Sequence, residues 1–156
     1  MHFTMSYSSV FGVDYHLIRI GIVLCLLLWG CAEAKIDAAL WRRLNYLVCV
    51  FSLCLILFFT VWKRTSSDVH TLVFALPESG DFIREMVMNA VLFFPLGLCL
   101  SSLIGFWSVA VAFALSLGIE AWQYATGCGT AQGTDLIMNV IGAFLGTLHL
   151  FKRSSS

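Results

Sequence analysis

The chain has 156 residues, of which 60% are hydrophobic and only 12% are charged, whereas an average soluble domain is about 45–50% apolar and about 25% charged. Nine Lys and Arg residues balance nine Asp and Glu residues, so no net charge attracts a nucleic acid. These values exclude a disordered chain, an ordinary soluble enzyme and more than about one domain. They predict an all-α membrane protein in which residues 1–156 form a single transmembrane domain.

The first half of the sequence predicts two transmembrane helices, each of which needs about 20 mostly apolar residues. Residues 16–34 form the first such segment, with Arg19 and Glu33 near its ends, where a long side chain can reach the membrane interface. Residues 44–62 carry no charge and predict the second helix. No Lys or Arg precedes the first apolar segment, so we expect a retained helix rather than a cleaved signal peptide.

The segment 63–85 separates these two helices from the rest and is mostly polar. It contains one short apolar run, residues 69–76, which is too short to cross a membrane. We expect this segment to be an interfacial loop. It could act as a simple tether or as a lid over the polar residues of the later helices.

The second half of the sequence predicts three more helices. Residues 86–119 contain no charge, and a single helix of that length would measure about 51 Å, too long for a hydrocarbon core of about 30 Å. Because Ser and Gly favour turns, we expect the chain to fold back at residues 101–105. This gives helices at 86–102 and 106–125, and a last helix follows at 135–151. The sequence thus predicts a polytopic bundle of about five helices, embedded in a bacterial plasma membrane.

The orientation follows from the basic residues that flank these spans. Five lie on the side of the C-terminus and four on the opposite side, and the larger number marks the cytoplasm. We therefore expect the N-terminus and the 63–85 loop to lie outside the cell.

Cysteine and histidine give no sign of a metal site. The six cysteines contain no C-x-x-C pair, and no spacing places two of the four histidines on one helix face. We therefore predict no bound metal and no cofactor.

Polar side chains inside the last three helices are the candidate functional residues, because each is costly in a membrane without a partner. Their positions place them near one membrane face, the face of the 63–85 loop. This polar cluster comprises Asn89, Ser116, Glu120, Gln123, Asp135 and Asn139.

Two interpretations of the polar cluster remain open. In the structural one, the side chains join helices by hydrogen bonds, and Asp135 caps the last helix. In the functional one, they line a pocket in which Glu120 and Asp135 are candidate catalytic groups that could move a proton or bind a cationic headgroup.

Close helix packing is expected at the end of the chain. Gly142 and Gly146 form a G-x-x-x-G motif, and small residues at this spacing let two membrane helices approach closely. We therefore assign both glycines to helix packing.

Three ordered motifs resemble those of the VanZ-like family of small bacterial integral membrane proteins. Residues 89–97 resemble N-x-x-x-F-x-P-x-G, residues 116–123 resemble S-x-x-I-E-x-x-Q, and residues 135–146 resemble D-x-x-x-N-x-x-G-x-x-x-G. The resemblance covers roughly residues 84–150. Residues 1–62 show no matching motif.

The family is associated with resistance to the glycopeptide antibiotic teicoplanin, so the resemblance implies a role in the cell envelope. It leads us to expect a protein that modulates antibiotic or lipid interactions at the membrane surface. The partners would be membrane lipids, a lipid-linked cell-wall precursor or a glycopeptide. Two alternatives are an intramembrane acid/base enzyme acting on a lipid-linked substrate, for which no nucleophile with an adjacent base is present, and a structural subunit of a larger complex or homo-oligomer.

Overall fold

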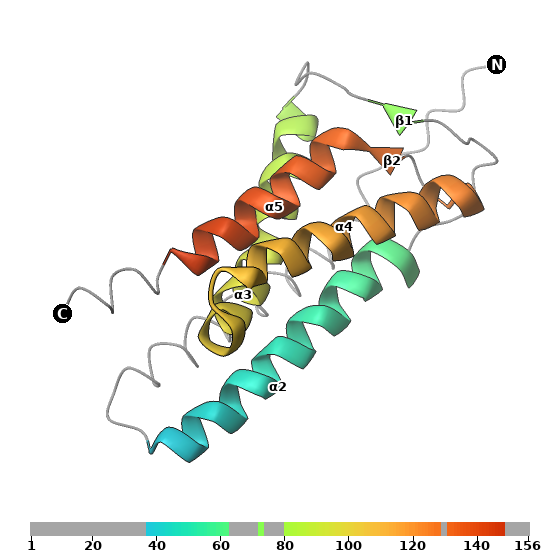
Figure 1. The fold of residues 1–156 in the computed structure, drawn as a ribbon. Coiled ribbons are helices and arrows are strands. Elements are labelled where there is room, and N and C mark those ends of the chain that lie inside the picture. Colours follow the sequence, from blue (N-terminus) through green and yellow to red (C-terminus); the bar gives the residue numbers. More distant parts are fainter. Residues whose placement is uncertain (1–36, 63–71, 74–79, 129–130, 149–156) are drawn as a thin grey trace, which may run out of the picture.

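The computed structural model describes residues 37–62, 72–73, 80–128 and 131–148. These residues form four α-helices, one π-helical turn and two very short strands (Figure 1). The predicted all-α character is therefore confirmed for the described part of the chain. The helix predicted at 16–34 lies outside the described residues.

The first two described helices differ in detail from the predicted spans. Helix α2 covers Ala38–Leu57 and continues into the π-helical turn η1, Phe58–Trp62. Helix α3 covers Gly80–Ile104 and thus begins six residues before the predicted span. Hydropathy marks the residues that suit hydrocarbon, whereas a helix also includes polar residues such as Arg84 and Glu85 at its exposed start. The predicted 63–85 loop is shortened accordingly.

A tight turn joins α3 to helix α4, Trp107–Thr126, within the predicted fold-back region. Gly105 adopts a left-handed conformation with φ 61°, which glycine accepts without steric cost. Its backbone N–H donates to the Ser101 carbonyl at 2.8 Å, and its carbonyl accepts from the Ser108 N–H at 3.2 Å. The chain reverses here because the glycine ends one helix while its own peptide groups remain hydrogen-bonded.

Helix α4 ends at a second left-handed glycine, Gly127, with φ 65°. Strand β2, Ala131–Gln132, follows and leads directly into helix α5, Gly133–Thr147. Strand β1, Leu72–Val73, pairs with β2 in parallel, with Leu72 opposite Ala131. The middle of the predicted 63–85 loop is therefore bound to the start of α5, a pairing too short to produce a periodic sequence pattern.

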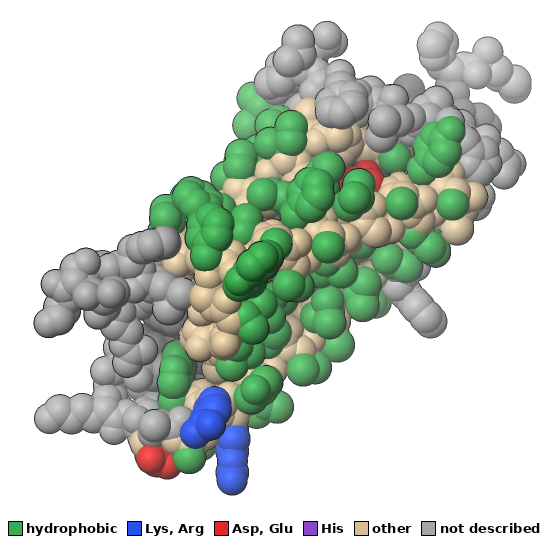
Figure 2. All heavy atoms as spheres, viewed as in Figure 1, with side chains coloured by type: hydrophobic (Ala, Val, Ile, Leu, Met, Phe, Trp, Pro, Cys, Tyr) green, Lys and Arg blue, Asp and Glu red, His purple; other side chains and the backbone are tan. Residues whose placement is uncertain are grey.

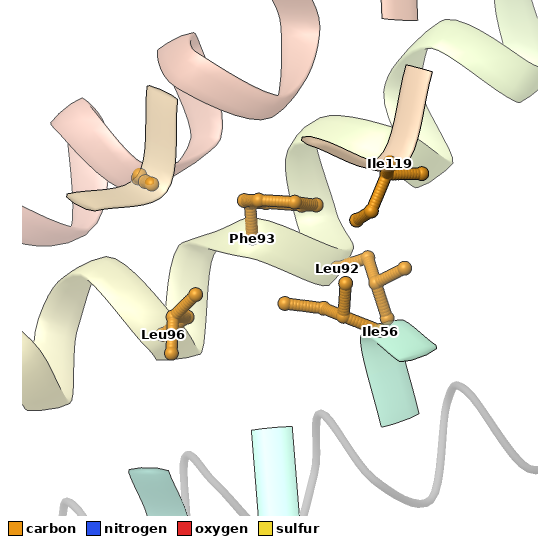
Figure 3. Packing of buried hydrophobic residues seen from close by; sticks show 7 residues of the cluster. Ile56, Leu92, Phe93, Leu96 and Ile119 are labelled. Carbon is orange, nitrogen blue, oxygen red and sulfur yellow. The ribbon is translucent and has the colours of Figure 1, made fainter. Parts of the chain in front are cut away.

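The hydrophobic core lies where α2, α3, α4 and α5 meet. Phe93 and Ile56 are fully buried there (Figure 3). The core consists of Ile56, Leu92, Phe93, Leu96, Ala112, Ile119 and Ala143.

The contact between α3 and α5 is the closest in the bundle. A Cβ atom at Gly142 would lie 1.9 Å from the Ala90 carbonyl oxygen, and one at Gly146 would lie 2.3 Å from that of Phe94. From the other side, a Cβ at Gly97 would lie 2.1 Å from the Ala143 carbonyl oxygen. Only glycine fits at these three positions, so the two backbones touch directly along this seam.

The outside of the bundle is mostly apolar (Figure 2). Two helical segments, Ala39–Val61 and Ile83–Ile104, are long and apolar enough to cross a membrane. Arginine side chains gather at the end of the bundle where α2 begins, and Arg42 and Arg43 are both exposed there.

Candidate functional site

Polar and small side chains form a buried stripe along α4 that faces α5. Ser108, Ala112, Ser116 and Glu120 follow one another at intervals of four residues, so they share one face of the helix. All four are buried. The small side chains let the two helices approach, and the polar ones find partners across the interface.

Three hydrogen bonds connect α4 to α5 and to the strand before it. Ser108 Oγ and Thr147 Oγ1 lie 2.9 Å apart, and Asn139 Nδ2 donates to Ser116 Oγ at 2.9 Å. Glu120 Oε2 accepts from the backbone N–H of Gln132 at 2.7 Å. From Ser108 to Glu120 along α4, the partners run backwards along the chain from Thr147 to Gln132, as expected for antiparallel helices.

Glu120 accepts a hydrogen bond from the N-cap residue of α5. Its carboxylate is 7% exposed and accepts the N–H of Gln132, which is the N-cap residue of α5 and makes no cap hydrogen bond with its own side chain. The first N–H groups of a helix have no intrahelical partner, and a negative charge is favourable at that end. Glu120 therefore supplies from α4 the acceptor that α5 lacks.

Asp135 lies in the first turn of α5 and is 7% exposed. The expectation that it caps the helix is wrong, because α5 begins at Gly133, two residues earlier. The preceding strand extends the hydrogen-bonded chain to Gln132, which then takes the cap position. Asp135 still suits the positive end of the helix dipole, and it lies one turn before Asn139 on the same face.

Gln123 joins α4 to the end of α2. Its Nε2 donates to the backbone carbonyl of Thr60 at 2.9 Å, and the side chain is 1% exposed. Thr60 lies in η1, and the last carbonyls of a helix lack partners within it. The glutamine satisfies one of these carbonyls and so joins α4 to the end of α2 at this end of the bundle.

One hydrogen bond joins two members of the polar cluster directly. The structure links Ser116 directly to Asn139 and places Glu120 and Gln123 one and two turns further along α4. Asn89 lies half-buried on α3, beside Ala90, whose carbonyl faces Gly142.

Sequence reasoning missed three residues that lie at this end of the bundle. They are Thr60, Gln132 and Thr134. Thr60 takes part through its backbone carbonyl and Gln132 through its backbone N–H, groups that every residue carries. Their participation therefore leaves no signature in the sequence, although Gln132 and Thr134 do flank the predicted Asp135.

Unpartnered oxygen atoms concentrate at the same place. Among the residues that the structure describes, five buried side-chain polar atoms have no hydrogen-bond partner, and all five are oxygens. Four belong to this end of the bundle: Gln123 Oε1, Gln132 Oε1, Thr134 Oγ1 and Asn139 Oδ1. We call these four atoms the acceptor site. Within the described ranges, no three His, Cys, Asp or Glu side chains gather closely enough to hold a metal ion.

Comparison with known proteins places this arrangement in a family. The model of the VanZ/LLP1 family matches residues 43–152. The chain belongs to the VanZ/LLP1 family. The matched region contains the whole polar cluster, the acceptor site and the glycine seam between α3 and α5.

A curated relative supports the assignment. Over 72 residues the chain is 40% identical to Protein VanZ of Enterococcus faecium, a match that covers 44% of this chain and 44% of that protein. The chain thus spans less than half the length of this VanZ relative in the matched region. No solved structure matches the chain.

Proposed function

We propose that this VanZ/LLP1 family member is an integral membrane protein of the bacterial cell envelope. In this proposal it modulates the interaction of glycopeptide or lipoglycopeptide antibiotics, or of lipids, with the membrane surface. The family membership supports the envelope role. The shape and surface of the bundle support the location in a membrane.

The observation that carries the proposal is the exposed apolar surface. Along α2, Leu47 is 66% exposed and Val50 is 59% exposed, although both are large and apolar. On α4, exposed aromatic side chains lie near both ends, with Trp107 at one end and Trp122 and Tyr124 at the other. Trp and Tyr favour the two membrane–water interfaces, so this pattern suits a helix that crosses a bilayer.

Glu120 has a structural role in this proposal, because its Oε2 accepts the Gln132 N–H at the start of α5. The proposed partners are membrane lipids and lipid-linked or lipid-like molecules at the outer surface.

Antibiotic susceptibility tests the proposed function. The chain is expressed in a susceptible Gram-positive host, and its membrane level is checked by immunoblot. We expect a higher minimal inhibitory concentration of teicoplanin than in cells that express an unrelated membrane protein at the same level. Unchanged susceptibility to teicoplanin and to lipid-directed antibiotics, with the protein present in the membrane, would overturn the proposal.

Site-specific labelling tests the orientation that the proposal needs. In a variant without native cysteines, a single cysteine at Ser67 should react with a membrane-impermeant maleimide on intact cells. A cysteine at Asp37 should react only after the cells are opened. The reverse pattern would place the polar cluster at the cytoplasmic face and exclude action at the outer surface.

A further inference from the structure

One exposed face of α2 carries two basic side chains and a tyrosine close to the start of the helix. Arg42, Arg43 and Tyr46 are all exposed, and Tyr46 follows the two arginines by four and three residues. Residues at these separations are neighbours on a helix surface, with their Cβ atoms about 5–6 Å apart. The tyrosine therefore lies one turn further along α2 and, in rotation about the helix axis, between the two arginines.

The direction of helical side chains brings the polar ends of these three residues toward the start of α2. Long side chains in a helix lean toward its N-terminus, so we expect the Tyr46 ring to extend toward the turn that carries Arg42 and Arg43. Arginine and tyrosine at a membrane boundary place their polar groups at the surface and keep their apolar atoms beside hydrocarbon. Two guanidinium groups and one phenol thus offer hydrogen-bond donors on the same face.

The charge of the two arginines is not neutralised by another described residue. Arg42 and Arg43 form no ion pair with the described part of the chain, whereas Arg84, at the start of α3, has an interaction partner. Asp37, the N-cap residue of α2, precedes Tyr46 by nine residues, which is two and a half turns and places it on the opposite side of the helix. The first turn of α2 contains no acidic residue, so the positive end of the helix dipole adds to the attraction for an anion.

The same face of α2 continues beyond Tyr46 as an apolar track. Val50, Leu53 and Leu57 follow at intervals of four, three and four residues, and they are 59%, 37% and 42% exposed. A different face of α2, which carries the fully buried Ile56, packs into the core. From Tyr46 to Leu57 the helix rises about 17 Å, which is about half of a hydrocarbon core of about 30 Å. The track therefore has the length of one lipid leaflet.

We propose that this face of α2 binds an anionic phospholipid, with the headgroup phosphate at the two arginines and Tyr46 and one acyl chain along the apolar track. Guanidinium groups bind phosphate oxygens through paired, charge-assisted hydrogen bonds. An apolar track directly beyond the basic groups matches a molecule with a charged head and a hydrocarbon tail better than it matches a free anion. This proposal rests on the membrane location in the proposed function and names a lipid partner for the end of the bundle where α2 begins.

Thermal unfolding of the purified full-length protein in a neutral detergent tests the proposal. A ligand that binds the folded state raises the melting temperature in a saturable way. Phosphatidylglycerol should raise it, whereas phosphatidylcholine with the same acyl chains, which has no net charge, should raise it much less. Glycerol 3-phosphate carries the anion without acyl chains and should give no shift at the same concentration.

A double variant and a matched control locate the binding. Arg42→Gln combined with Arg43→Gln removes two charges from exposed positions, so the melting temperature without lipid should remain that of the parent. The apparent affinity for phosphatidylglycerol should fall by about tenfold or more, because each basic residue near an anionic membrane surface contributes a factor of about five. Arg84→Gln removes one positive charge at the other end of the bundle and should leave this affinity unchanged.

Three results would overturn the proposal. One is an equal shift with phosphatidylglycerol and phosphatidylcholine, which would mean that lipids only solvate an apolar surface. Another is a shift of the same size with glycerol 3-phosphate, and the third is unaltered affinity in the double arginine variant. The susceptibility test of the function is made in cells and does not depend on this measurement, so failure of one can be told from failure of the other.

Discussion

The two ends of the interface between α4 and α5 use polar side chains in different ways. At one end, the Thr147 hydroxyl donates its single hydrogen to the Ala143 carbonyl at 2.9 Å, so Ser108 must be the donor in the 2.9 Å contact between the two hydroxyls. At the other end, Asn139 and Gln123 donate with their nitrogens and leave their oxygens without partners. The first end is a closed pair, and the second is an open group of acceptors.

Polar residues at the first end use their hydrogen-bonding capacity to join helices, whereas those at the second end keep part of it unused. Both kinds are buried, and both interrupt apolar helices, so burial and sequence position do not distinguish them. The difference lies in whether the hydrogen-bonding capacity is used up. Ser108 and Thr147 each give one hydrogen and satisfy it locally, whereas an amide carries more groups than one neighbour can satisfy.

The largest effect is expected at the glycine seam that holds α5 in place for both ends. Gly142→Ala would put a Cβ atom 1.9 Å from the Ala90 carbonyl oxygen, so the helices must separate. We expect a loss of unfolding free energy of about 3 kcal/mol or more, measured by SDS-induced unfolding in detergent. Gly118→Ala is the matched control, because nothing lies within 4 Å of the added atom. That control should be stabilising by roughly 0.5–1 kcal/mol, and equal behaviour of the two variants would contradict the packing of α3 on α5.

The next largest loss of stability is expected at the hydrogen bond between Glu120 and the Gln132 N–H, before the first turn of α5. Glu120→Leu removes the acceptor of the Gln132 N–H and leaves that donor buried, so it should cost about 1–3 kcal/mol of unfolding free energy. Glu120→Gln keeps an acceptor oxygen and should cost clearly less. Equal losses in the two variants would mean that the charge of Glu120, rather than its hydrogen bond, stabilises this end.

A smaller effect is expected at the closed end. Thr147→Val removes the hydroxyl that Ser108 contacts and should cost about 1 kcal/mol. Because Ser108 then lacks its partner, Ser108→Ala added to Thr147→Val should cost less than the sum of the two single losses. Additive losses would show that the two hydroxyls act independently and that this end is not a closed pair.

The smallest effect on stability is expected at the acceptor site itself. Thr134→Val removes a buried oxygen that has no partner among the described residues, so the protein should lose no stability. Thermal unfolding in detergent without added lipid measures this. A loss as large as that of Thr147→Val would mean that Thr134 is hydrogen-bonded within the protein and that the two ends are alike.

The sequence by itself determined the helical class, the approximate positions of the described helices and the fold-back near residues 101–105. These follow from long uncharged segments and from a glycine that tolerates a left-handed conformation, both of which are local properties. It also singled out Ser116, Gln123 and Asn139, because polar groups in apolar helices are conspicuous.

Only the tertiary structure decided which groups meet. The Gln132 N–H that Glu120 accepts and the Thr60 carbonyl that Gln123 binds are backbone groups, which every residue has. Asp135 lies inside α5 rather than at its cap, and the cap residue Gln132 also pairs with Val73 of the distant strand β1. The absence of partners for the four oxygens of the acceptor site likewise depends on how many hydrogen-bonding groups each side chain meets across the interface. That number is set by the register of α4 on α5, which no local pattern encodes, whereas the close approach of a helix at Gly142 was predicted by the G-x-x-x-G motif.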